Sequence, residues 1–210
     1  MSLFKIAHEV KNPLAVCKGY LSMIKKDNID EAFNYIDIIN KEVDKSLMII
    51  GDFSEFGKIK LNIDILDISY LVEEVVDTLS SMFKSSNAKV FLDLLDDEIF
   101  IDADYNRIKQ VLVNVFKNSL EAKSSSPLLI DVKMKVDNIG YINIIIKDNG
   151  IGMSKESLDK ISEPFFSTKE NGTGLGVALS KEIIELHGGS VRYKSSLGKG
   201  TTVIISLPLK

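Results

Sequence analysis

The sequence has a single cysteine, Cys17, so the chain can form no internal disulfide bond. We therefore expect a reducing cytoplasmic compartment, with Cys17 as a small core residue. Basic blocks are also missing, and the net charge of −4 argues against nucleic acid as a partner. No apolar run approaches the roughly 18–20 residues that cross a bilayer, and no secretory signal, repeat or low-complexity segment is visible.

A chain of 210 residues can form one large domain or two small ones, and 45% apolar with 27% charged residues is typical of a globular protein. The two parts of the chain differ in the period of their apolar residues. Residues 1–57 have helical spacing, interrupted by Pro13 and the polar turn "KKDNID". Residues 58–210 alternate helical and strand patterns, and Gly57 is the expected helix stop between the parts. We predict two domains, 1–57 and 58–210.

The first domain is predicted to be a helical hairpin. One helix runs from Ser2 to about Lys26, and a second, capped by Asn28 or Asp30, runs to about Phe56. The second helix has apolar residues near heptad spacing, which are Phe33, Ile36, Val43, Leu47 and Ile50. Two helices cannot bury both of their apolar stripes, so we expect a homodimer that forms a four-helix bundle. A hairpin packed on its own second domain is the alternative.

The second domain is predicted to be an α/β sandwich with a mixed sheet, so the fold class is α+β. Strand patterns occur in residues 89–95, 98–104, 128–136, 141–147, 189–196 and 200–209. The strands 128–136 and 141–147 should form a hairpin around "DNIG".

Three helices are predicted in the same domain. The first has a stripe of Leu71, Val75, Leu79 and Met82. The second covers residues 104–123, with Ile108, Val111, Leu112, Val115 and Ala122 facing inward. The third covers residues 177–187.

Polar residues on the helix 104–123 mark a candidate binding face. Asn114, Asn118 and Glu121 share one side of the helix, and Lys117 lies beside them. Carboxamide oxygens can hold a hydrated Mg²⁺, and a lysine can contact phosphate. An ordinary solvated helix face is the competing interpretation.

A second candidate site is the segment "KDNGIGM", which follows the strand 141–147. Asp148 can accept a hydrogen bond from an exocyclic amine such as that of adenine. Gly150 and Gly152 let the backbone turn and approach a ligand closely. A simple turn after a strand is the alternative.

Glycines form the third candidate site. Gly172, Gly174 and Gly176 precede a helix whose first amides can hold phosphate oxygens. The dinucleotide fingerprint fails at Val177 and a Walker A loop fails at Gly200, so neither common phosphate loop is present. The polar segment "EPFFSTKENGTG" before that helix is typical of a mobile lid with glycine hinges.

Together these motifs resemble the kinase core of bacterial two-component sensor histidine kinases. "AHEVKNPLAV" resembles that family's histidine motif, "NVFKNSLEA" its asparagine motif and "DNGIGM" its first glycine motif. "EPFFSTK" resembles its phenylalanine motif and "GTGLG" its second glycine motif. The resemblance covers nearly the whole chain in the family's order, and "KNSLEA" is similar to the subgroup of nitrogen-regulatory and sporulation kinases.

The resemblance implies an ATP-binding domain of the gyrase, chaperone and histidine kinase type, which uses ATP and Mg²⁺. Asn118 would coordinate the metal ion, with Asn114 and Lys117 assisting at the phosphates, and Asp148 would read adenine. The implied pocket and lid residues are Gly150, Gly152, Thr168, Lys169, Gly172, Thr173, Gly174, Leu175, Gly176 and either Thr202 or Thr201. Phosphoryl transfer is mostly positioning and charge neutralisation, so few protein groups need to react.

The same resemblance implies that the γ-phosphoryl group of ATP moves to His8. A neutral imidazole is a competent nucleophile near pH 7, and Glu9 would orient His8 or accept its proton. Pro13 should bend the helix just after the histidine. Glu9 and Asn12 have the spacing by which some family members dephosphorylate their partner, so phosphatase activity stays open. The implied partner is a response regulator receiver domain, which takes the phosphoryl group on an aspartate.

Two rival functions stay open at this point. A gyrase-like or chaperone-like ATPase would have a glutamate four residues before the metal-binding asparagine, where this chain has Asn114. A non-catalytic phosphotransfer adaptor would have lost its nucleotide site, whereas Asn118, Asp148 and the lid glycines are all present.

The histidine lies unusually near the start of the chain for that family. Only seven residues precede His8, and no sensing region is visible. We therefore expect a piece of a longer kinase, with any membrane association through the missing sensor region. The signal, the cognate regulator, and phosphorylation within or between subunits do not follow from the sequence.

Overall fold

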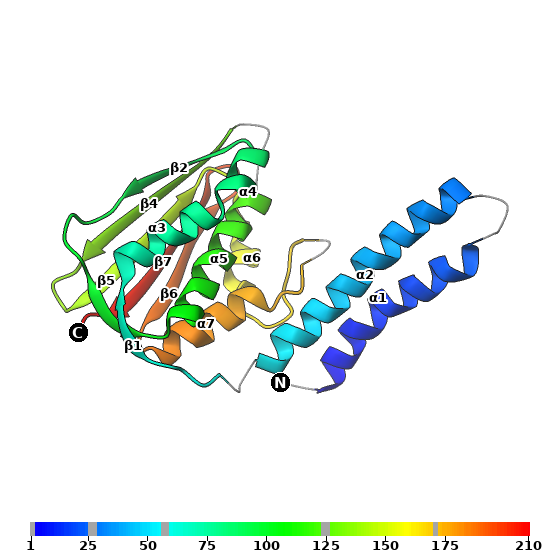
Figure 1. Ribbon diagram of the computed structural model, residues 1–210, viewed down its shortest axis with the longest axis horizontal. Coiled ribbons are helices and arrows are strands. Elements are labelled where there is room, and N and C mark those ends of the chain that lie inside the picture. Colours follow the sequence, from blue (N-terminus) through cyan, green and yellow to red (C-terminus); the bar gives the residue numbers. More distant parts are fainter. Residues whose placement is uncertain (1–2, 25–28, 56–58, 123–126, 170–171) are drawn as a thin grey trace. The chain divides into compact units, whose positions relative to one another are not determined.

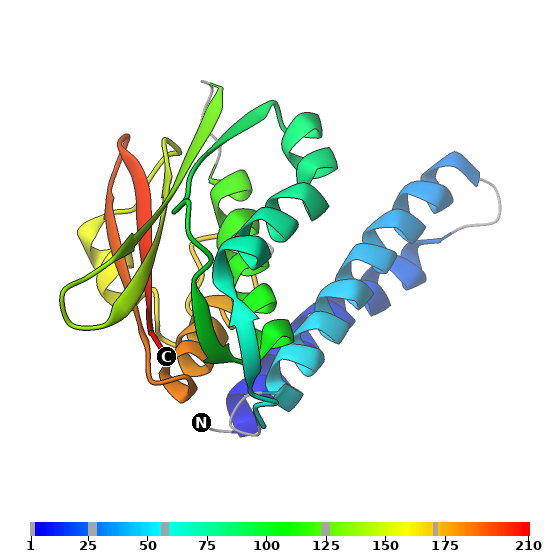
Figure 2. The same cartoon turned by 60° about the vertical axis from the view of Figure 1, so that its left-hand side comes forward.

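The computed structural model describes residues 3–24, 29–55, 59–122, 127–169 and 172–210 (Figures 1 and 2). The chain forms two compact units, one of residues 1–59 with 164–176 and the other of residues 60–163 with 177–210. The predicted domain boundary, the turn with its Asn28 cap and the stop at Gly57 lie outside the described residues. The boundary therefore stays a prediction.

The first unit contains the predicted helical hairpin. Helices α1 (Leu3–Met23) and α2 (Ile29–Glu55) lie side by side and run in opposite directions (Figure 1). Cys17 is buried between them, and its Sγ donates to the carbonyl of Ile39, so its predicted core role is confirmed. Asp30 lies inside the first turn of α2, so the prediction that it caps the helix is wrong. Neither helix, and no other helix in the described ranges, combines the length and apolarity of a membrane span.

The heptad residues of α2 are not buried within the chain. Their exposed fractions lie between 37% for Val43 and 62% for Phe33. Ile49, one position before the predicted Ile50, is buried instead, at 2% exposure. The hairpin thus uses one side of α2 internally and leaves an apolar stripe exposed.

A mixed five-stranded sheet forms the centre of the second unit, as predicted. Its order is β2-β4-β5-β7-β6, with bounds Ala88–Asp93, Leu128–Val136, Tyr141–Asp148, Gly200–Pro208 and Ser190–Ser196. Strand β2 pairs with β4 in parallel, and every other neighbouring pair in this sheet is antiparallel. The predicted hairpin of β4 and β5 is confirmed.

Helices α3 (Ile68–Thr78), α5 (Tyr105–Glu121) and α7 (Gly176–Leu186) cover one face of this sheet (Figures 1 and 2). Alternate residues of β5 point into that layer, so Ile142, Ile144 and Ile146 are fully buried. The four predicted inward residues of α5 from Ile108 to Val115 are buried as well. Ala122 is only half-buried and forms the C-cap of α5, so its predicted core role is wrong.

The structure differs from the sequence prediction in its shortest elements. The stripe from Leu71 to Met82 is divided at Leu79 into α3 and α4 (Ser80–Ser85), and Met82 is exposed. Strand β1 (Asp64–Asp67), which pairs with β3 (Phe100–Ala103), and helix α6 (Lys155–Lys160) were not predicted. Four- and six-residue elements are too short to show a sequence period.

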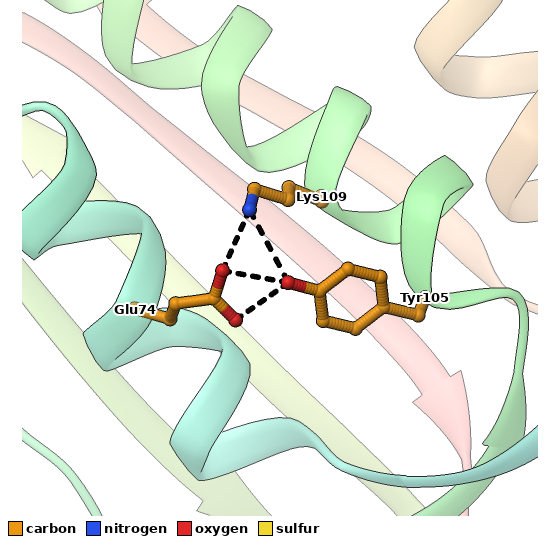
Figure 3. Close-up of polar contacts among 3 residues, drawn as sticks. All are labelled: Glu74, Tyr105 and Lys109. Atoms are coloured by element: carbon orange, nitrogen blue, oxygen red, sulfur yellow. Dashed lines mark hydrogen bonds and ion pairs between the residues drawn. The ribbon is translucent and has the colours of Figure 1, made fainter.

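A polar cluster joins α3 to the start of α5 (Figure 3). The Glu74 carboxylate accepts hydrogen bonds from Lys109 Nζ and from the Tyr105 hydroxyl, both at 2.6 Å. Lys109 Nζ also lies 5.3 Å from the centroid of the Tyr105 ring. The hydrogen bonds from Lys109 and Tyr105 lower the pKa of Glu74 and, in turn, the Glu74 partner raises the pKa of Lys109. The cluster thus fixes one end of α5, the helix that carries the candidate asparagines.

Candidate functional site

Asp148 is the last residue of β5 and is only 3% exposed. Its Oδ1 accepts from the backbone N–H groups of Gly150, at 2.9 Å, and Thr201, at 3.1 Å, and its Oδ2 accepts from the Ser119 hydroxyl at 3.3 Å. Burial raises the pKa of the Asp148 carboxyl, and these three hydrogen bonds only partly offset that effect. The carboxylate is therefore oriented by the chain, and its Oδ2 can still accept from an amine.

The glycines after β5 allow the chain to approach itself closely. At Gly152, whose φ is +66°, a Cβ would overlap the carbonyl of Ser196. At Gly200, whose φ is +82°, a Cβ would overlap the carbonyl of Asp148, and at Gly150 it would overlap that of Ala122. The close approach that we predicted for Gly150 and Gly152 is thus to the chain's own backbone. It packs the loop against the end of α5 and the β6–β7 turn.

The carboxamides of α5 lie together on one face, as predicted. Asn114 Nδ2 donates to the hydroxyl of Ser180 on α7 at 2.9 Å, and Asn118 Nδ2 lies 3.4 Å from Asn114 Oδ1. Both asparagines are half-buried, while Lys117 and Glu121 are exposed. This face is therefore partly ordered by α7 and is not a freely solvated row of side chains.

Thr201, and not Thr202, is the residue that the structure brings to Asp148. Thr202 pairs across the sheet with Lys147 and Lys194, which are both exposed. Because neighbouring strand residues face opposite sides, Thr201 lies on the other face of β7. Its backbone N–H donates to Asp148, as described above.

The lid segment, residues 164–176, is described except for residues 170–171 and belongs to the unit that contains the hairpin. The N–H of Phe165 donates to the carbonyl of Gly174 at 2.8 Å, and a Cβ at Gly174 would overlap the Phe165 backbone. Phe165 itself has a φ of +69°, which is unusual for a residue with a side chain. The phenylalanine and second glycine motifs are thus joined at the base of the lid.

Inside the lid the predicted residues form local turns. The Lys169 N–H donates to Ser167 Oγ at 3.0 Å, and the Gly172 N–H donates to the Lys169 carbonyl at 3.3 Å. The Leu175 N–H donates to Thr173 Oγ1 at 3.3 Å, and the Leu175 side chain is fully buried. Thr168 is exposed, and Gly176 is the first residue of α7.

His8 lies on α1 with its side chain exposed. The side-chain amide of Asn12, one helical turn further on, lies 3.4 Å from Nδ1 of His8, and Glu9 is half-buried. Helix α1 continues through Pro13, whose missing N–H leaves the Glu9 carbonyl without its usual helix donor. The predicted bend after the histidine stays a prediction.

The chemistry of the asparagine face fits a magnesium ion. Among the described residues, no group of three or more His, Cys, Asp or Glu side chains could cage a metal. Mg²⁺ does not need such a cage, because it usually keeps several waters and takes one or two protein oxygens together with substrate phosphates. The amide side chains of Asn114 and Asn118 offer oxygen ligands of that kind.

Three contributors to the site were missed by sequence reasoning. Ser119 and Gly200 reach Asp148 from other elements, and Ser180 orients Asn114. Gly200 had a sequence signal, since a glycine that opens a strand indicates close backbone approach. The two serines had none, because their contacts join residues far apart in the chain.

Two family descriptions match the chain. "Histidine kinase-, DNA gyrase B-, and HSP90-like ATPase" matches residues 103–210, more than half of the chain, and "His Kinase A (phospho-acceptor) domain" matches residues 5–62. The chain therefore belongs to the family of histidine kinase-, DNA gyrase B- and HSP90-like ATPases. With the phospho-acceptor domain in front of the ATPase domain, it is the core of a bacterial two-component histidine kinase.

The curated relatives are longer than this chain. Sporulation kinase E of Bacillus subtilis (strain 168) is 34% identical over 206 residues, which are 98% of this chain and 28% of that protein. Sporulation kinase B of the same organism is 34% identical over 207 residues, 97% of this chain and 48% of the relative. AtoS of Escherichia coli (strain K12), a signal transduction histidine-protein kinase, is 33% identical, and the alignment covers 34% of that protein. The chain thus spans less than half the length of these relatives.

Solved structures agree in fold. The histidine kinase ThkA, in a crystal structure with the response regulator protein TrrA, aligns with a TM-score of 0.83 and 25% identity. That alignment covers 98% of this chain and 60% of the other. The catalytic domain of ThkA alone aligns with a TM-score of 0.63 and 26% identity over 70% of this chain and 96% of the other.

Proposed function

We propose that the protein is an ATP-dependent histidine kinase that autophosphorylates on His8 and passes the phosphoryl group to an aspartate of a response regulator receiver domain. The observation that carries the proposal is the buried, three-fold hydrogen-bonded Asp148 in the same chain as the exposed His8. Burying a carboxylate is unfavourable, and buried groups with a shifted pKa cluster at functional sites. We therefore interpret Asp148 as the residue that accepts a hydrogen bond from an adenine amine.

The nucleotide site that we propose is built around Asp148. Its Oδ2 accepts from the exocyclic amine of adenine, and its Oδ1 is held by the backbone N–H of Thr201. Asn118 is the metal ligand, with Asn114 and Lys117 near the phosphates. Bound Mg²⁺ would neutralise phosphate charge. The lid residues Thr168, Lys169, Thr173 and Leu175, with the lid glycines, close over the nucleotide, and the first amides of α7 favour phosphate oxygens.

The transfer step involves few protein groups. We assign Nε2 as the attacking atom, because Nδ1 of His8 lies against the Asn12 amide. The Nε2 lone pair is free only in the tautomer that carries the ring proton on Nδ1, so the Asn12 Nδ2–H must release Nδ1 before transfer. A bond forms between Nε2 and the γ-phosphorus, the bond from that phosphorus to the leaving oxygen of ADP breaks, and the Nδ1 proton passes to Glu9. Phosphatase activity by Glu9 and Asn12 stays a prediction from their spacing.

Two partners are part of the proposal. The exposed stripe of α2 supports a second copy of the chain, which would cover it in a four-helix bundle. A receiver domain would dock on the hairpin beside His8, as the exposure of that side chain allows. The crystal structure of ThkA with TrrA supports this kind of partner.

The test is a labelling experiment with γ-labelled ATP and Mg²⁺. The chain has two histidines, and the other one, His187, is 7% exposed, so acid-labile, alkali-stable label should reside on His8. His8→Ala should take no label, while Lys18→Ala, a change at an exposed position on the same helix, should label normally.

Other outcomes select the rival functions. Release of free phosphate without label on the protein favours an ATPase. Failure to bind nucleotide favours a phosphotransfer adaptor. Label that persists in His8→Ala contradicts the assignment of the acceptor.

A further inference from the structure

His187 is a buried histidine that the proposed chemistry does not use. It follows α7 directly, and both of its ring nitrogens have partners. Nδ1 lies 2.7 Å from the carbonyl of Ile183, and Nε2 accepts from the backbone N–H of Asp104 at 2.9 Å. A carbonyl can only accept and an amide N–H can only donate, so the ring is neutral with its proton on Nδ1.

Asp104 joins three segments at this point. It is the N-cap of α5, and its Oδ1 accepts from the Arg107 N–H at 3.1 Å. Its Oδ2 accepts from the N–H of Asn62, which precedes β1, at 2.8 Å. Burial acts to raise the pKa of Asp104, but the N–H groups of Asn62, Arg107 and Asn106 hold it below its ordinary value. His187 therefore attaches the end of α7 to a well-ordered N-cap.

Helices α5 and α7 are tied at two separate points. One tie is Asp104 to His187, and the other is Asn114 to Ser180. Asp104 and Asn114 are ten residues apart, so the ties lie about 15 Å apart along α5. Two ties fix the angle between the helices as well as their separation. Both helices contribute to the proposed nucleotide site, α5 through its asparagines and α7 through its first turn.

We infer that His187 is a positioning residue for the nucleotide site: its Nε2 holds α5 against α7 so that the asparagines and the α7 N-terminus face the phosphates together. This inference rests on the proposed ATP-dependent function. His187 does not touch the substrate. It acts through Asp104 and α5.

Two substitutions at residue 187 separate the roles of the two ring nitrogens. In His187→Gln the amide oxygen can take the place of Nε2 and accept from Asp104. In His187→Asn the amide nitrogen can replace Nδ1 and donate to Ile183, but the side chain is too short to reach Asp104. We expect His187→Asn to raise the KM for ATP and the Kd of a non-hydrolysable ATP analogue by on the order of tenfold, because small displacements of positioned groups are costly. His187→Gln should stay within about twofold of the wild type.

Ser206→Ala is the control for stability alone. Ser206 is buried, and its hydroxyl donates to Asn143 Oδ1 at 2.6 Å within the sheet. Its backbone pairs with Ser190, shortly after His187, but its side chain takes part in neither tie. The Ser206→Ala variant should have a lower urea midpoint than the wild type and an unchanged KM for ATP. If His187→Asn behaves like Ser206→Ala, or if the Gln and Asn variants have equal KM values, His187 has a structural role only and the inference is wrong.

A further measurement needs no variant. Mg·ATP should slow hydrogen exchange at the Asp104 amide by roughly severalfold, because ordering the nucleotide site orders the remote tie. An unchanged exchange rate would overturn the inference. A wild-type protein that takes no label refutes the kinase function itself, whereas normal labelling with a normal KM in His187→Asn refutes only the positioning role.

Discussion

Replacing Asp148 by asparagine separates the stability of the fold from its function. The raised pKa of Asp148 means that the folded state holds the proton more tightly than the unfolded state does. Stability therefore falls as the pH rises from the unfolded pKa to the raised folded pKa, and above the folded pKa the ionised carboxyl has its full cost. Asparagine cannot ionise, and its oxygen can still accept from Gly150 and Thr201 while its amide donates to Ser119. We expect Asp148→Asn to unfold in urea at pH 7.5 no earlier than the wild type.

The same substitution should weaken ATP binding. A hydrogen bond to a charged acceptor contributes about 1.5–3 kcal/mol, so losing the one that we assign to the adenine amine raises the Kd by roughly 10- to 150-fold. Because only the ionised carboxylate can accept at both oxygens, wild-type affinity should also fall as the pH drops through the raised pKa of Asp148. The variant should lack this dependence.

Isothermal titration with a non-hydrolysable ATP analogue, from pH 5 to 8, measures the loss of affinity in the variant and the pH dependence of the wild-type affinity. Asp137→Asn is the matched control. Hydrogen bonds from the Tyr141 N–H, Asn143 and the Ile139 N–H keep the pKa of Asp137 low, so this variant should lose stability at pH 7.5 and keep its ATP affinity. Wild-type affinity in Asp148→Asn, or a lower urea midpoint than in Asp137→Asn, would refute the reasoning.

Two further predictions concern the scaffold. Gly152→Ala should cost at least about 2 kcal/mol of unfolding free energy, because it adds a clash with the Ser196 carbonyl to the strain of a positive φ. Gly198→Ala is the control, since Gly198 has a φ of +73° and no atom within 4 Å of an added Cβ, so this variant should show the strain alone. Equal urea midpoints of the two variants would contradict the prediction. Glu74→Gln should lower the urea midpoint at pH 7, and since the Glu74 pKa is depressed below 4.5, its difference from wild type should disappear as the pH falls through that depressed value. A difference that persists at pH 2 would show that charge is not what holds the cluster of Figure 3 together.

Long, strongly periodic segments were predictable from the sequence. The inward face of α5 from Ile108 to Val115 and the β4–β5 hairpin around "DNIG" follow from residue period and turn chemistry. Helix α2 shows the limit of this reasoning. Its heptad residues were identified, but a period alone does not say whether the partner is the neighbouring helix or another molecule.

The candidate site was predictable where its residues are close in sequence. Asn114 and Asn118 lie one turn apart, so their shared face follows from helix geometry. The partners of Asp148 could not be predicted in this way, because Ser119 lies far before it in the sequence and Thr201 lies far after it. Choosing Thr201 over Thr202 required the strand register, which depends on pairing with β5.

Two of the three hydrogen bonds to Asp148 come from the main chain, at Gly150 and Thr201. Side-chain changes at residue 201 leave that N–H in place, and only proline removes it. Ser119 is therefore the position at which a substitution can adjust the charge state of the carboxyl without rebuilding the loop. Most substitutions around this carboxylate should therefore leave its orientation intact, while the burial that raises its pKa comes from the fold as a whole and Ser119 supplies only the one adjustable side-chain contribution.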